Sequence, residues 1–151
     1  MSAHLLAIDL GLKTGLAVFS QRGALVRYRS QNYGTVSRLK RAAWGELASV
    51  SGLALVVVEG DRGLARVWAR AAGKRGVCAR CIQAHLWRQE ILAEKDARSG
   101  VAAKAAAGVL ARAVVTRSGL PRPTALRHDA AEAICIGLWA CGQLGWPQIV
   151  R

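Results

Sequence analysis

Apolar and polar positions along the chain predict strands first and helices later. Residues 5–19 are apolar up to Asp9, turn through glycines and then become apolar again, which is typical of a β-hairpin. Residues 24–29 alternate apolar and basic side chains, which predicts a third, half-exposed strand. Residues 53–58 are continuously apolar and rich in Val, as in a strand buried on both faces. This strand ends at Glu59, so two predicted central strands end at an acid.

Helical spacing of apolar residues dominates the remainder of the chain. The predicted helices cover residues 35–50, 62–74, 87–92, 102–116 and 125–141. A strand is expected within residues 76–82, a charged and mobile loop over 94–100, and a proline-containing linker over 118–124. The predicted order is therefore βββαβαβ followed by helices. This order indicates an α/β fold, with a mixed sheet covered by helices.

Composition limits the domain number and the class of partner. With 151 residues, 52% of them hydrophobic, the chain can bury one good core, so we expect a single domain over 1–151. The 22 Lys and Arg residues outnumber nine Asp and Glu residues and give a net charge of +13, which predicts a polyanionic partner such as nucleic acid. No apolar run approaches the roughly 20 residues of a membrane span, and the N-terminus does not resemble an export signal. We therefore expect a protein of the cytoplasm or nucleoid with no membrane partner.

Four cysteines are expected to be reduced in that compartment. Cys78 and Cys81 have a spacing found in zinc sites, but side chains three apart on a strand point to opposite faces of a sheet. We therefore expect buried thiols rather than a zinc site. The four cysteines covered by this prediction are Cys78, Cys81, Cys135 and Cys141. The three histidines, His4, His85 and His128, are expected to be ordinary polar residues and not metal ligands.

Four of the nine acids occupy positions where they can converge. Asp9 and Glu59 end predicted central strands, and Asp129 and Glu132 lie at i and i+3 on one face of the last helix. A turn could explain Asp9 alone, and the helix dipole could explain one acid near the helix start. Converging carboxylates repel by about 4 kcal/mol per pair at ~4 Å, so such a cluster indicates bound cations. Oxygen ligands favour Mg²⁺ or Mn²⁺, and two such ions promote phosphodiester hydrolysis. The set predicts a metal-dependent nuclease.

Basic residues recur every fourth position along the second predicted helix. Arg62, Arg66, Arg70 and Lys74 share one face, and no acid occurs between residues 62 and 89. A solvated helix face usually mixes positive and negative charges, so this stripe favours contacts with phosphates over the simpler explanation of solubility.

The acid-bearing segments resemble those of Holliday-junction resolvases of the RuvC type, within the ribonuclease H-like superfamily. The segments are AIDLGLKTGLAVF, LVVVEG and HDAAEAICIGLWA. This resemblance implies a five-stranded mixed sheet covered by helices on both faces, and a homodimer that makes paired nicks at a four-way DNA junction in recombination and repair. It also implies that two Mg²⁺ ions, replaceable by Mn²⁺, are held by the catalytic residues Asp9, Glu59, Asp129 and Glu132.

Residues 83–111 are similar to a family segment that carries DNA-binding basic residues, and Lys104 is the clearest counterpart. The expected DNA-binding residues are Lys13, Arg62, Arg66, Arg70, Lys74, Arg88 and Lys104. Two features depart from the family pattern. Glu132 stands where an Asp is usual, and Arg62 and Leu64 stand where an aromatic wedge is usual, with Trp68 a turn further along.

Two alternative functions remain open at this point. One is a nuclease of the same fold acting on structured RNA, as in YqgF-like proteins, and the other is a non-catalytic, basic nucleic-acid-binding module. An actin-like phosphotransferase is excluded by length, because that architecture needs two such domains. A helicase partner cannot be read from the residues. Among the five tryptophans, we expect Trp68 or Trp139 at a dimer contact.

Overall fold

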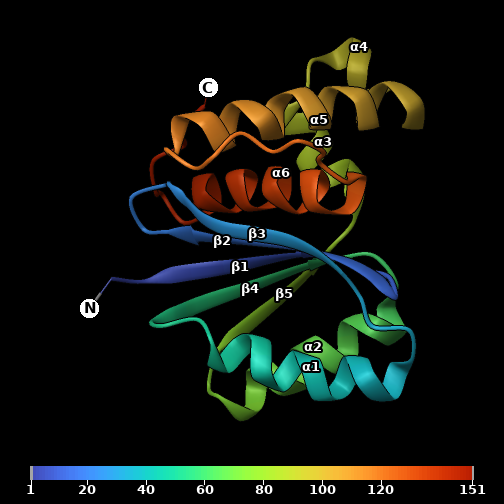
Figure 1. Cartoon of the computed structure of the whole chain (residues 1–151), viewed down its shortest axis with the longest axis vertical. Helices are drawn as coiled ribbons and strands as arrows, with labels where there is room; N and C mark the ends of the chain where they lie inside the picture. The colour runs from blue at the N-terminus through green and yellow to red at the C-terminus, as the bar shows by residue number, and fades with distance from the viewer. Residues whose placement is uncertain (1, 151) are drawn as a thin grey trace.

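The computed structural model describes residues 2–150 and contains one five-stranded sheet of order β3-β2-β1-β4-β5 between two layers of helices (Figure 1). The strands are β1 His4–Asp9, β2 Lys13–Ser20, β3 Leu25–Asn32, β4 Leu53–Glu59 and β5 Cys78–Ile82. The helices are α1 Val36–Ala48, α2 Arg62–Lys74, α3 Ala84–Ile91, α4 Glu94–Ala97, α5 Gly100–Arg117 and α6 His128–Gln143. The predicted element order and mixed sheet are confirmed.

Strand pairing brings the ends of β1 and β4 together. β1 pairs antiparallel with β2 and parallel with β4, and the register sets Asp9 beside Glu59 on one side and Gly15 on the other. The backbone N–H of Leu10 donates to the Glu59 carbonyl at 2.8 Å, which continues this pairing just past the strand end. In the β1–β2 turn, the buried Thr14 hydroxyl donates to the Gly11 carbonyl at 2.6 Å. Asp9 and Glu59 are thus fixed side by side at the C-terminal ends of two central strands.

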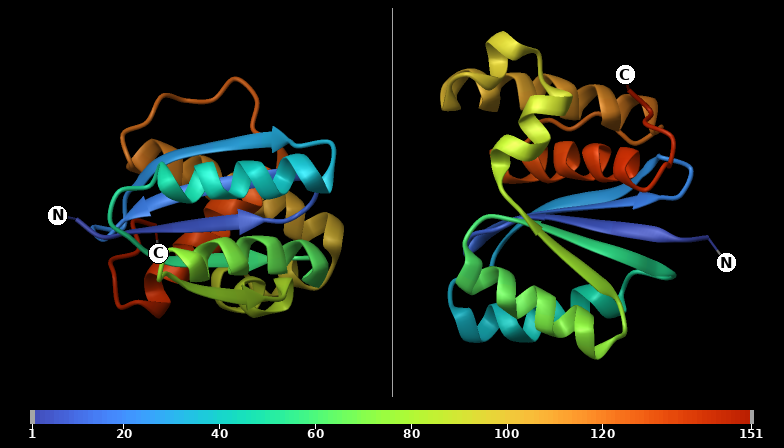
Figure 2. Two further views of the ribbon diagram at one scale, coloured as in Figure 1. Left: turned by 90° about the horizontal axis from the view of Figure 1, so that it is seen from below. Right: turned by 180° about the vertical axis from the view of Figure 1, so that it is seen from behind.

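Each face of the sheet is covered by its own helices. α1 and α2 lie side by side on one face, and α6 lies on the other with α5 packed outside it (Figures 1 and 2). Alternate residues of β1 supply the two hydrophobic clusters, Leu5 and Ala7 toward α6, Leu6 and Ile8 toward α1 and α2. Because α6 is enclosed between the sheet and α5, every residue from 130 to 141 except Glu132 is buried. Within residues 2–150, none of the helices combines the length and apolar character needed to cross a membrane.

Most helix boundaries agree with the sequence within three residues, but the segment 94–100 differs. It was expected to be a loop, whereas residues 94–97 form α4 and Gly100 opens α5. The Ser99 hydroxyl accepts a hydrogen bond from the Ala102 N–H at 3.1 Å, so an N-cap allows the next helix to start earlier than its alanine-rich composition suggested. α6 starts at His128 instead of residue 125.

Two predictions about burial are wrong. Trp68 and Trp139 are buried, at 0% and 2% exposure, so neither is available for the expected dimer contact, whereas Trp44 is 48% exposed. Both buried indoles lie on the faces of α2 and α6 that pack against the rest of the molecule. Cys78 and Cys81 are exposed because β5 is an edge strand, whereas Cys135 and Cys141 are buried as expected.

A prediction concerns Gly15, because a Cβ at this position would collide with the backbone carbonyl oxygen of Asp129 on α6. Gly15→Ala should therefore destabilise the protein by at least about 1–3 kcal/mol. Urea unfolding followed by circular dichroism measures the loss. The matched control is Gly108→Ala in α5, where a Cβ meets nothing within 4 Å and should add up to about 1 kcal/mol of stability. Equal stability of Gly15→Ala and the unmodified protein would contradict the close approach.

Candidate metal centre

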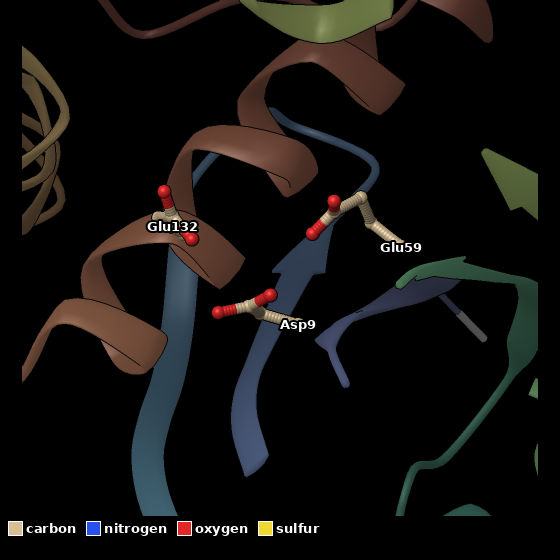
Figure 3. Close-up of side chains that lie close together, drawn as sticks. All are labelled: Asp9, Glu59 and Glu132. Atoms are coloured by element: carbon tan, nitrogen blue, oxygen red, sulfur yellow. The ribbon is translucent and has the colours of Figure 1, made fainter. Parts of the chain in front are cut away.

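Three carboxylates from distant parts of the chain face one another at the end of the sheet (Figure 3). Asp9 ends β1, Glu59 ends β4, and Glu132 comes from the second turn of α6. One carboxylate oxygen from each residue lies within 4.8 Å of the others. The cluster therefore joins two neighbouring strand ends to a helix that crosses above them.

The close approach of α6 to the sheet depends on small side chains. Ala130, Ala131 and Ala133 are buried beside Glu132, and Gly15 lies directly beneath the Asp129 carbonyl. Larger residues at these positions would lift the helix away from the strand ends. The resulting rotation of α6 aims Glu132 at the strand ends, where only 12% of its side chain is exposed.

Among the carboxylates of the cluster, Asp9 has a strongly raised pKa. Burial is the largest effect on Asp9, followed by its hydrogen bond with Glu59 and the negative charges of Glu132 and Glu59. Together they raise the pKa of Asp9 from 3.8 to about 10, so this group holds a proton at neutral pH. That proton allows three acids to share the space without cations.

Arg88 supplies one positive charge at the edge of the cluster. Its Nη2 lies 2.8 Å from Glu132 Oε1, and 23% of its side chain is exposed. The guanidinium also lies 5.4 Å from the centre of the buried Trp87 ring, which restrains it further. The sequence did not suggest this pair, because the two residues are 44 positions apart and come from different helices.

Asp129 is held differently from the other three predicted acids. Its Oδ2 accepts from the Ser30 hydroxyl at 2.8 Å, and its Oδ1 accepts from the Ala130 N–H at 2.7 Å. The three-carboxylate group does not include it. Its assignment as a fourth ligand therefore stays a prediction, while the structure brings Asp9, Glu59 and Glu132 together.

The donor set fits hard divalent cations. All three groups offer carboxylate oxygens, which suit Mg²⁺ or Mn²⁺. Burial and the neighbouring acids Glu59 and Glu132 raise the pKa of Asp9, which is the electrostatic effect that a bound cation would oppose. Asp9, Glu59 and Glu132 are therefore the residues that could hold such an ion.

The predicted DNA-binding residues lie on several different elements. Lys13 is exposed at the start of β2, the four-residue stripe is exposed along α2, and Lys104 is exposed on α5. Arg88 differs from the rest because its guanidinium already pairs with Glu132. Its role as a DNA contact stays a prediction.

A second prediction follows from the raised pKa of Asp9. Between its ordinary value of 3.8 and about 10, the folded state binds a proton that the unfolded state releases, so this group lowers stability as pH rises. In metal-free protein, Asp9→Asn should therefore raise the melting temperature by at least a few degrees near pH 8 and change it little near pH 4. Thermal melts in a chelating buffer measure this difference.

The control for that measurement is Glu94→Gln, because the Glu94 side chain is 88% exposed on the surface. Its effect on the melting temperature should be small at both pH values. An Asp9→Asn variant that is less stable near pH 8, or equally changed at both pH values, would contradict the assignment of the buried proton.

Comparison with known proteins supports the fold. No family model and no curated protein sequence matches the chain. Among solved structures, the chain is similar to T. thermophilus RuvC in complex with a Holliday junction substrate, with a TM-score of 0.63 and 19% sequence identity. The similarity covers 95% of this chain and 96% of that chain. The chain therefore has the five-stranded, helix-covered ribonuclease H-like fold that the family resemblance implied.

Proposed function

We propose that this protein is a metal-dependent endonuclease that resolves four-way DNA junctions. The observation that carries the proposal is the convergence of Asp9, Glu59 and Glu132, with oxygens within 4.8 Å, inside a protein of net charge +13. Acids gathered at such a distance in a basic protein need a function, because spreading them over the surface would avoid their repulsion. Cleavage of a phosphodiester gives them one.

The residues would divide the chemistry as follows. Asp9, Glu59 and Glu132 would hold two divalent cations, Mg²⁺ or Mn²⁺, with Asp129 as the further ligand. Such ions, when bound, lower the pKa of an attacking water and stabilise the leaving oxygen. Asp9 must release its proton to solvent before it can act as an anionic ligand. Arg88 holds one oxygen of Glu132 and so orients that longer side chain.

The fold favours branched DNA as the substrate. The similar solved structure is RuvC with a Holliday junction, and its likeness extends over nearly the whole chain. Exposed cations on α2, β2 and α5 would contact the phosphates; they are Lys13, Arg62, Arg66, Arg70, Lys74 and Lys104, with Arg88 near the metal centre. A non-catalytic binding module would not explain why three acids from distant parts of the chain converge.

The proposed function also implies a domain organisation, a cellular location and an oligomeric state. We propose that residues 1–151 act as one nuclease domain, associated with the nucleoid in the cytoplasm. Resolution needs two nicks on strands related by the near two-fold symmetry of a junction, whereas each chain offers one carboxylate cluster. A two-fold symmetric homodimer supplies the second centre.

The test of the chemistry replaces each acid by its amide. Asp9→Asn and Glu59→Gln remove charge with little change of shape, and should lower Mg²⁺-dependent nicking of a four-way junction by more than about 100-fold. Even residues outside a metal's ligand shell commonly contribute 10–100-fold. Junction binding, measured by gel shift in a chelating buffer, should persist. Endonuclease assays on a junction, duplex DNA and structured RNA measure substrate choice.

Two further variants make this test specific. Glu132→Asp shortens the side chain but keeps its charge, and should retain nicking, whereas Glu132→Gln should lose it. Glu94→Gln changes an acid that is 88% exposed and does not belong to the carboxylate cluster, so it serves as the matched control and should remain fully active. Nicking that survives in both Asp9→Asn and Glu59→Gln would refute the proposed centre, and preference for RNA would favour the YqgF-like alternative.

The test of assembly is the mass of the protein in solution. Light scattering at micromolar concentration, alone and with a four-way junction, should give twice the 16.1 kDa of one chain as the protein component. A dimer is expected because paired nicking needs two centres. A chain that stays monomeric in both conditions would contradict the paired-nick mechanism.

A further inference from the structure

A basic groove runs between the two helices that cover the sheet face opposite α6. Lys40 and Trp44 of α1 form one wall, and Arg66, Arg70 and Lys74 of α2 form the other. The groove has a volume of about 510 Å³, which lies in the range of roughly 300–1,000 Å³ found for ligand sites. Val67 and Ala71 add apolar side chains to its lining. Three of the four stripe residues thus border a hollow instead of a convex helix surface.

Trp44 gives this groove an exposed aromatic surface. It is 48% exposed, whereas the indoles of Trp68, Trp87 and Trp139 are buried. The guanidinium of Arg75, at the end of α2, lies 5.9 Å from the centre of the Trp44 ring. This cation–π contact ties the indole to α2 and shows that the ring can accept a planar, electron-poor group.

Charge decides which partner fits the groove. The residues that line it, all within the described part of the chain, include four cations and neither Asp nor Glu. The nearby Glu46 of α1 lines a different hollow and pairs with Arg29. A second copy of the chain docked here about a two-fold axis would set this basic wall against itself. A polyanion is the complementary occupant.

We propose that the α1–α2 groove binds an unpaired DNA strand, with a base stacked on Trp44 and phosphates on Lys40, Arg66, Arg70 and Lys74. Positively charged grooves with aromatic side chains bind single strands because phosphates follow the cations and every base has a face that can stack. Base-paired duplex lacks that free face. The choice of DNA over RNA rests on the proposed function, whereas the groove itself does not depend on cleavage.

The groove is connected to the metal centre by the start of α2. A second hollow next to it is lined by Gly60, Arg62, Arg66 and Gln83, so Arg66 borders both. Gly60 directly follows Glu59, whose carboxylate belongs to the metal centre. A strand that leaves the cleavage site would therefore meet Arg62 and Arg66 before it reaches Trp44.

The experiment measures the anisotropy of fluorescein-labelled oligothymidine in a chelating buffer, so that cleavage plays no part. Trp44→Ala should weaken binding by about tenfold, because stacking contributes about 1–3 kcal/mol per base, and Trp44→Phe should retain most of the affinity. Neither variant should change binding of a short blunt duplex by more than about twofold. The double change Arg66→Gln and Arg70→Gln should lower the slope of log K against log salt by about 1.4, or ~0.7 per contact.

Controls separate the groove from general charge and from misfolding. Arg122→Gln removes an exposed cation outside the groove, in the segment after α5, and should leave binding of the single strand unchanged within about twofold. Tryptophan fluorescence of the unmodified protein should be quenched by oligothymidine, and this quenching should be lost in Trp44→Phe. The fluorescence test holds even if Trp44→Ala fails to fold.

Three outcomes would overturn the proposal. They are unchanged single-strand affinity in folded Trp44→Ala, an equal loss on duplex and single strand, and tighter binding of oligouridine than of oligothymidine. The last would assign the groove to RNA. Because the assay contains no divalent metal, failure of the groove is distinguishable from failure of the proposed nuclease centre, which is tested by nicking with Asp9→Asn.

Discussion

The structure depends on bringing α6 close enough to the sheet for one of its acids to meet two others at the strand ends. This approach requires Gly15 beneath the Asp129 carbonyl and alanines on either side of Glu132. It also makes the centre costly in the absence of cations, since burial and neighbouring charge raise the pKa of Asp9 to about 10. The fold itself therefore brings the three acids together, even though their proximity and burial are electrostatically unfavourable.

The sheet order explains why these acids can converge at all. β1 lies between an antiparallel partner and a parallel one, so its C-terminal end adjoins both the turn into β2 and the end of β4. The two faces of the sheet also differ: the buried helix α6 covers one face, and the amphipathic helices α1 and α2 cover the other. α6 places the acid Glu132 at the ends of β1 and β4, whereas α2 keeps its basic side chains exposed to solvent.

Local patterns in the sequence were sufficient to predict the strands, the boundaries of α2 and the acids that end β1 and β4. They could not predict which of Asp129 and Glu132 faces those acids, because this depends on the rotation of α6 and on the hydrogen bond from Ser30 to Asp129. The pairing of Arg88 with Glu132 was missed for a similar reason, since it joins two helices. The burial of Trp68 was misjudged because apolar spacing identifies a helix face without showing how far neighbouring elements cover it.

The same reasoning separates the two kinds of basic residue on this protein. Arg88 is partly enclosed beside Trp87 and paired with an acid, so its charge acts first on the carboxylate cluster. Arg66, Arg70 and Lys74 border a hollow that holds no acid, so their mutual repulsion is relieved only by ions or a partner from solution. A chain with net charge +13 thus uses few cations to stabilise itself and leaves most of them exposed. An exposed excess of positive charge of this kind attracts polyanions from solution, which agrees with the proposed binding of DNA.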